Sequence, residues 1–155
     1  MSGVTAGVKI EKALLGFLVV LGLTIVALIG WVLWSMYVPL NLFEAPAVWR
    51  VRERAIHAGD DLITEVKFCK NTDLPAVIGR MTLGKDLSGN EYIFNHPNIT
   101  GSLPAGCHSK RLAIVTLAPN VRPGKYRVIV TIRYDYSAFR TVQQNYMTEE
   151  FDVIQ

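Results

Sequence analysis

The stretch ALLGFLVVLGLTIVALIGWVLWSMYVPL, residues 13–40, decides how the chain begins to fold. It contains no charged side chain. A helix over residues 13–37 would be roughly 37 Å long, and the hydrocarbon core of a bilayer is about 30 Å thick. A buried core helix of this length without a charge is not expected in so small a chain. We therefore predict a transmembrane helix over residues 13–38.

The second half of this segment is rich in aromatic residues. Trp31, Trp34 and Tyr37 recur at three-residue spacing. Tryptophan and tyrosine concentrate where a membrane meets water, so these three residues are predicted to be membrane-interface anchors. The hydroxyls of Thr24 and Ser35 are expected to hydrogen-bond to the preceding turn of the helix.

A cleaved signal peptide is the alternative to a permanent anchor. Such a peptide has an apolar region of roughly 7–15 residues followed by a small-residue cleavage site. Ala45-Pro46-Ala47 has that pattern, but it lies well beyond the apolar segment, which is also too long. We favour an uncleaved signal anchor. The expected organisation is a tail at residues 1–12, a linker at residues 39–46 and a folded domain at residues 47–155.

Basic residues flank the helix on both sides. Lys9 and Lys12 precede it closely, which favours a cytoplasmic N-terminus and an extracytoplasmic C-terminal domain. Arg50, Arg52 and Arg54 follow at a greater distance and oppose this orientation. These arginines fit either contacts with lipid headgroups or the charged outer face of an edge strand.

One face of the predicted helix carries small residues. Gly16, Ala27 and Gly30 lie within a narrow arc at the helical period, and small residues let two helices approach closely. A homo-oligomer formed through the helix is therefore one possibility. The ordinary composition of membrane helices explains the same residues, and no GxxxG motif lies within residues 13–38.

The charge balance argues against nucleic acid as a partner. Sixteen Lys and Arg residues stand against 13 Asp and Glu residues, for a formal net charge of +3. A protein that binds phosphates needs a dense basic stripe, and none is present.

The rest of the chain has the pattern of an all-β domain. In residues 125–136, Tyr126, Val128, Val130, Ile132 and Tyr134 alternate with more polar neighbours, which predicts a strand with one buried face. Further strands are expected at residues 48–56, 61–70, 76–83, 91–94, 111–117 and 149–154. Residues 85–90 are predicted to form a hairpin turn and residues 95–106 a long loop.

Three segments carry a resemblance to a known architecture. They are Ala58-Gly59-Asp60-Asp61-Leu62, Leu103-Pro104-Ala105-Gly106 and Pro123-Gly124-Lys125-Tyr126-Arg127-Val128. The layout resembles the immunoglobulin-like or fibronectin-like β-sandwiches of extracytoplasmic proteins, with Tyr126 in a place similar to that of a tyrosine-corner residue. The chain departs from antibody domains, because no cysteine lies in the late strand and the usual disulfide between the two sheets is absent.

Under this resemblance the two cysteines come close together. Cys69 would end one strand and Cys107 would precede its antiparallel neighbour. The resemblance thus implies a Cys69–Cys107 disulfide, which would suit an oxidising compartment. Two free thiols are the alternative.

No catalytic arrangement is recognisable in the sequence. Cys107 and His108 are adjacent, but C-x-x-C and H-x-x-x-H spacings are missing, so neither a metal nor another cofactor is expected. His96, Pro97, Asn98 and Pro104 fall in the long loop, where a rigid scaffold commonly presents binding residues. They are the predicted recognition residues.

We therefore expect a non-enzymatic, single-pass membrane protein. Its partners would be the lipid bilayer and another membrane or envelope protein, bound as a partner or as part of an envelope assembly. One alternative is a small exclusion or inhibitor protein that acts on a membrane channel or receptor through its helix. Another is a metal- or redox-linked accessory domain that uses Cys69, Cys107 and His108.

Overall fold

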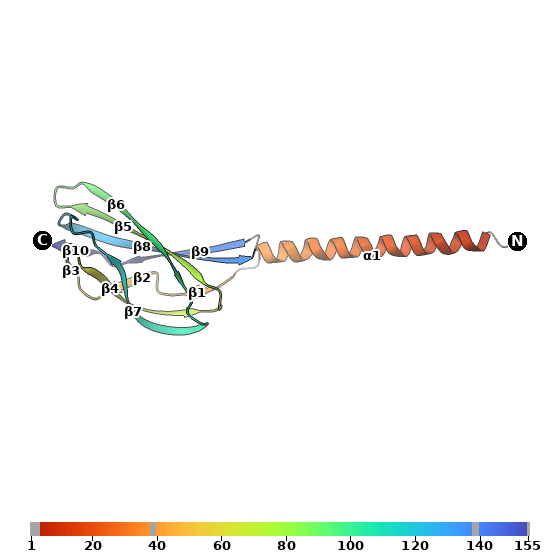
Figure 1. The fold of residues 1–155 in the computed structure, drawn as a ribbon, viewed down its shortest axis with the longest axis horizontal. Helices are drawn as coiled ribbons and strands as arrows, with labels where there is room; N and C mark the ends of the chain where they lie inside the picture. The colour runs from red at the N-terminus through yellow and green to blue at the C-terminus, as the bar shows by residue number, and fades with distance from the viewer. Residues whose placement is uncertain (1–3, 38–39, 138–139, 155) are drawn as a thin grey trace. The chain divides into compact units, whose positions relative to one another are not determined.

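The computed structural model describes residues 4–37, 40–137 and 140–154 (Figure 1). The chain divides into two compact units, Met1–Pro39 and Leu40–Gln155. The expected end of the helix at residue 38 and the first three residues of the expected tail lie outside the described residues.

The first unit contains a single apolar helix, α1 (Val4–Tyr37). It begins inside the expected tail, because no proline or other helix-breaking sequence separates residues 4–12 from the apolar segment. Its portion Leu14–Tyr37 is long and apolar enough to cross a membrane. The hydroxyls of Thr24 and Ser35 each donate a 2.8 Å hydrogen bond to a backbone carbonyl of the preceding turn, as expected.

The second unit is mostly β-sheet. Its strands are β1 (Phe43–Glu44), β2 (Val48–Val51), β3 (Ala55–His57), β4 (Asp61–Lys70), β5 (Ala76–Asp86), β6 (Glu91–Gly101), β7 (Gly106–Thr116), β8 (Gly124–Ser137), β9 (Arg140–Thr148) and β10 (Phe151–Ile154). The described part of this unit contains no helix, as the sequence predicts.

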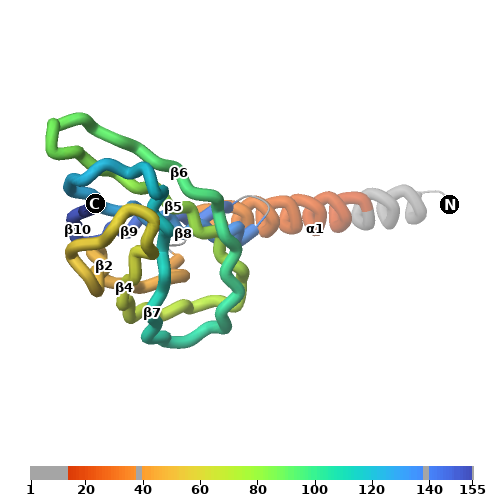
Figure 2. Tube along the Cα trace, turned by 60° about the vertical axis from the view of Figure 1, so that its left-hand side comes forward, coloured from red at the N-terminus to blue at the C-terminus, as the bar shows by residue number. Residues whose placement is uncertain are grey.

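Two long antiparallel ladders organise these strands. In one, β4 pairs with β7 along its whole length; in the other, β5 pairs with β6 on one side and with β8 on the other. β8 also pairs with both β9 and β10, and β10 pairs in turn with β3. β2 joins the ladders, because it pairs with both β4 and β9. Figures 1 and 2 show β4 and β7 on one side of this unit and β5, β6 and β8 on the other.

The core lies along the inward faces of β4 and β8. The five alternating residues of β8 from Tyr126 to Tyr134 are at most 3% exposed, so the period-two prediction for this strand is confirmed. Aromatic rings connect the two ladders beside them. Phe43 stacks on Phe68 with ring centroids 4.9 Å apart, and Tyr146 lies 5.5 Å from Phe43.

The predicted loop at residues 95–106 is largely wrong. β6 continues to Gly101 and β7 begins at Gly106, so only residues 102–105 connect them. The ladder between β5 and β6 shifts register between Ile78 and Arg80, opposite Pro97. A proline cannot donate a ladder hydrogen bond and is tolerated at such an irregularity, so it does not end the strand.

Three further elements also differ from the sequence prediction. β9 was not expected, because its inward residues include Gln144 and Thr148 and its hydrophobic alternation is weak. The expected linker at residues 39–46 contains β1 and the buried residues Leu42 and Phe43, so the domain begins before residue 47. The expected strand at residues 48–56 is split into β2 and β3, because its two halves pair with different partner strands.

Candidate functional site

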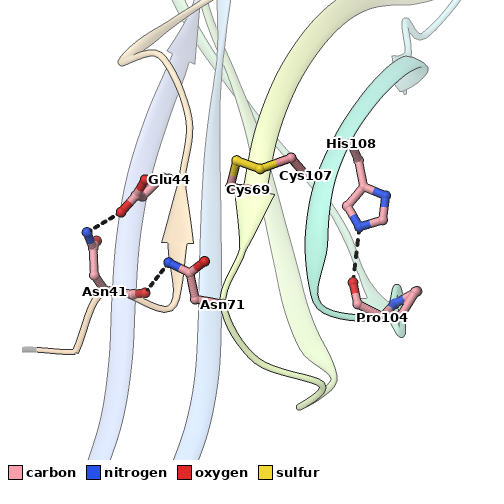
Figure 3. Close-up of a disulfide and its surroundings, with 7 residues drawn as sticks. All are labelled: Asn41, Glu44, Cys69, Asn71, Pro104, Cys107 and His108. Atoms are coloured by element: carbon pink, nitrogen blue, oxygen red, sulfur yellow. Dashed lines mark hydrogen bonds between the residues drawn. A yellow bond between two sulfur atoms is a disulfide. The ribbon is translucent and has the colours of Figure 1, made fainter.

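The two cysteines form a disulfide between neighbouring strands (Figure 3). Cys69 on β4 and Cys107 on β7 are direct ladder partners, with Cα atoms 4.0 Å apart. The pairing implied by the resemblance is confirmed, although Cys107 lies inside its strand and does not precede it. A disulfide indicates an oxidising compartment.

The start of the β-rich unit is fastened close to this disulfide. Glu44 on β1 is the ladder partner of Cys69. The Asn71 side chain donates a 2.8 Å hydrogen bond to the Asn41 carbonyl, and the Asn41 side chain donates one of 2.5 Å to the Glu44 carboxylate (Figure 3). The segment expected to be a linker is thus held against the end of β4.

His108 does not join the sulfurs in a ligand cluster. Its Nε2 lies 3.0 Å from the Pro104 carbonyl oxygen, and Figure 3 shows the imidazole directed toward Pro104 and away from the disulfide. Among the residues that the structure describes, no group of three or more His, Cys, Asp or Glu side chains is placed to hold a metal ion. Adjacent strand residues point to opposite faces, which explains why the neighbouring Cys107 and His108 separate.

The four predicted recognition residues occupy two structural settings. His96, Pro97 and Asn98 belong to strand β6, and only Pro104 lies in the connection to β7. His96 Nε2 is 2.8 Å from Thr82 Oγ1, and burial, followed by the positive charge of Arg80, lowers the pKa of His96. The four residues therefore do not form one loop, since three lie in β6 and Pro104 lies in the connection to β7.

The three arginines after the helix are exposed but do not share one strand. Only Arg50 lies in β2; Arg52 and Arg54 lie between β2 and β3. Arg50 pairs with β4, whereas β9 pairs with Val48 and Trp49, so the charged outer face of an edge strand stays a prediction. Contact with lipid headgroups stays a prediction. The predicted membrane-interface residues Trp31, Trp34 and Tyr37 have mostly exposed side chains on α1.

A cavity of about 240 Å³ lies between the two ladders. Its walls are almost entirely apolar, with residues from β1, β2 and β4 to β8, but Lys70 and Arg80 also line it. The exposed apolar side chains of Ile99, Leu103 and Leu112 form part of its lining on the β6 and β7 side.

Sequence reasoning missed the two cationic residues of this cavity. A signal existed for each. Lys70 has the same parity as the buried residues Leu62, Val66 and Phe68 of its strand, and Arg80 has the same parity as the buried Thr82. A cation at an inward position of an alternating strand predicts an unusual interior environment.

Comparison with known proteins identifies no family for this chain. No protein-family model matches it, and no curated protein sequence matches it. Among solved structures, an alkylpurine DNA glycosylase of Pseudomonas fluorescens, bound to DNA containing an abasic site analog, is similar with a TM-score of 0.41 and 11% sequence identity. The alignment covers 76% of this chain and 32% of that one, so this chain spans about a third of that protein's length. A likeness at this level carries no inference about fold or function.

Proposed function

We propose that this protein is a single-pass membrane protein whose extracytoplasmic β-sandwich domain binds a partner protein in a membrane or envelope assembly. It is not an enzyme in this proposal. The α1 helix would serve as an uncleaved signal anchor. The main support for an uncleaved anchor is that β1 lies before the Ala45-Pro46-Ala47 pattern, so cleavage there would remove this strand.

Cleavage at Ala45-Pro46-Ala47 would damage the folded domain. It would remove Leu42 and Phe43, which are 6% and 5% exposed, together with the ring stacking between Phe43 and Phe68. Removing a buried phenylalanine costs about 3–5 kcal/mol in a typical core. Retention of α1 therefore suits the domain better than its removal.

An immunoglobulin-like arrangement is the finer fold that we propose. In support of it, β4 pairs with β7, β5 pairs with β8, and the early strand β2 pairs with both ladders. The hydroxyl of Tyr126 donates a 2.8 Å hydrogen bond to the Arg122 carbonyl, four residues earlier. Such a bond back to the preceding corner is the feature of a tyrosine corner in these sandwiches.

The outer strand β6 is the surface that we propose for the partner. Among the described strands it pairs only with β5, which leaves one edge open over an 11-residue strand. Ile93 and Ile99 on this strand are 66% and 46% exposed. An open strand edge with apolar side chains is suited to adding a strand from another protein.

Photo-cross-linking in the native membrane tests this surface. A photoreactive amino acid at Ile93 should give a discrete cross-linked species, whereas the same amino acid at the exposed Glu53, between β2 and β3, should not. Equal cross-linking at both positions, or none at Ile93, would contradict the β6 surface.

Exchange of the helix separates this proposal from an inhibitor that acts through α1. If residues 4–37 are replaced by an unrelated anchor, the Ile93 cross-link should persist. Its loss, together with activity of the isolated helix, would favour the inhibitor. The mass of the mature protein tests the anchor itself, since an uncleaved chain retains residues 1–47 and the full 17.3 kDa.

A further inference from the structure

Two cations line the same cavity, Lys70, which is buried, and Arg80, which is half-buried. Lys70 is 3% exposed, and its ammonium donates a hydrogen bond to the Leu103 carbonyl. Arg80 donates from Nη1 to the Ile114 carbonyl at 2.7 Å and from Nη2 to the Pro97 carbonyl at 2.5 Å. Within the described residues, no carboxylate forms a salt bridge with either cation.

Unused hydrogen-bond donors accompany these charges. Arg80 Nε is buried and has no acceptor in the described structure. The same is true of Nε1 of Trp49, a cavity-lining residue that is 5% exposed. The ammonium of Lys70 has three donors, and the single bond to Leu103 leaves two of them. Buried donors are ordinarily paired, so two cations together with these two donors at one cavity favour an anionic ligand there.

The remaining walls select an apolar body for the same ligand. Phe68, Ile78, Val130 and Ile132 are among the side chains that line the space. Its 240 Å³ would hold about eight groups the size of a water molecule or a methylene, at about 30 Å³ each. The space is partly open beside Ile99, Leu103 and Leu112, whose side chains are at least 36% exposed.

We propose that this cavity binds a short aliphatic carboxylate of about eight carbons. Its carboxylate would be held by Lys70 and Arg80, and its chain would occupy the apolar space between the ladders. Charge complementarity favours an anion over a neutral alkane or an aliphatic cation. The apolar lining favours an aliphatic chain over a small inorganic anion. The site adjoins the proposed partner surface along β6 at Ile99, which lines the cavity and is also exposed on that strand.

Octanoate is the probe, added to the full-length ¹⁵N-labelled protein in nanodiscs of zwitterionic lipid. The chain has three tryptophans and therefore three indole N–H signals, two from α1 and one from the cavity. A Trp49→Phe variant identifies the cavity signal. Octanoate should shift the Trp49 signal saturably. Octanol, which lacks the charge, and acetate, which lacks the chain, should each bind at least about tenfold more weakly.

A pair of variants on one strand sharpens the test. Lys70→Met should weaken octanoate binding at least about tenfold, because a charge-assisted hydrogen bond is lost. Lys67→Met should bind as the wild type does, since Lys67 lies on the exposed face of β4. Should Lys70→Met not fold, the comparison of octanoate with octanol in the unmodified protein decides.

Four results would overturn the proposal. They are no shift of the Trp49 signal, movement of the Trp31 and Trp34 signals alone through partition into lipid, octanol binding as tight as that of octanoate, and full octanoate affinity in a folded Lys70→Met variant.

Discussion

Gly84 on β5 lies directly opposite Tyr126 on β8, and the ring of the tyrosine occupies the space that a Cβ on the glycine would need. Tyr126 is 1% exposed and holds the corner before β8 through its bond to Arg122. The glycine is therefore required by a close approach and not by an unusual backbone conformation.

Gly84→Ala should strongly destabilise the β-rich unit. The new methyl group would force the buried Tyr126 ring to move, and we expect a loss of about 3 kcal/mol in unfolding free energy, measured by urea denaturation. Gly79→Ala on the same strand is the control. There the nearest atom to a Cβ is the Asn98 side-chain oxygen at 3.4 Å, so the loss should stay below about 1 kcal/mol. Equal losses in both variants would contradict the specific role of the Tyr126 ring.

Tyr126→Phe should remove the corner hydrogen bond while keeping the ring. The Arg122 carbonyl would lose its 2.8 Å donor, at an expected cost of about 1 kcal/mol. Tyr136→Phe on the same strand is the matched control, because Tyr136 is 43% exposed. The two urea midpoints give the comparison, and a midpoint for Tyr126→Phe that equals the wild-type value would exclude a stabilising corner.

Loss of the disulfide should destabilise the unit by about 4 kcal/mol on the chain-entropy estimate for a 38-residue separation. The double variant Cys69→Ala/Cys107→Ala provides the measurement. Reducing agent should lower the urea midpoint of the wild type and leave that of the double variant unchanged. A wild-type midpoint that does not respond to complete reduction would be inconsistent with this role.

Acid should weaken the hairpin between β5 and β6 through Asp86. The hydrogen bond from the Asn90 side chain is the largest of the interactions that lower the pKa of Asp86 to about 2, against the opposing effect of burial. Backbone N–H groups of Ser88 and Asn90 and the Tyr92 hydroxyl also donate to this carboxylate. Because the folded pKa lies below the ordinary value of 3.8, the stabilisation is complete above about pH 4 and disappears as the pH falls through about 2.

Asp86→Asn is the variant that isolates this effect. Its urea midpoint should be lower than that of the wild type at pH 7, and the gap should narrow between about pH 4 and pH 2. Asp152→Asn, at an exposed position of β10, should retain the wild-type pH dependence. A gap that is the same at pH 7 and pH 2 would contradict the role of the ionised carboxylate.

Local patterns in the sequence determined the elements that depend on one segment alone. The uncharged run before Pro39 is long enough to be recognised as a helix without any partner, and the alternation from Tyr126 to Tyr134 defines a buried strand face by itself. The Cys69–Cys107 pairing also followed, once a resemblance supplied neighbouring strands.

Tertiary structure decided whatever depends on residues distant in the sequence. β9 exists because β8 and β2 supply its ladder partners, although its own alternation is weak. β1 forms because β4 pairs with it and Phe68 accepts the ring of Phe43. Lys70 shares the inward parity of its strand, but whether such a cation meets water or an apolar wall is decided by the strands that cover it. The sequence of one strand does not specify which side chains pack across from it. For this reason the cavity, its two cations and its unpaired donors are recognised only in the folded chain.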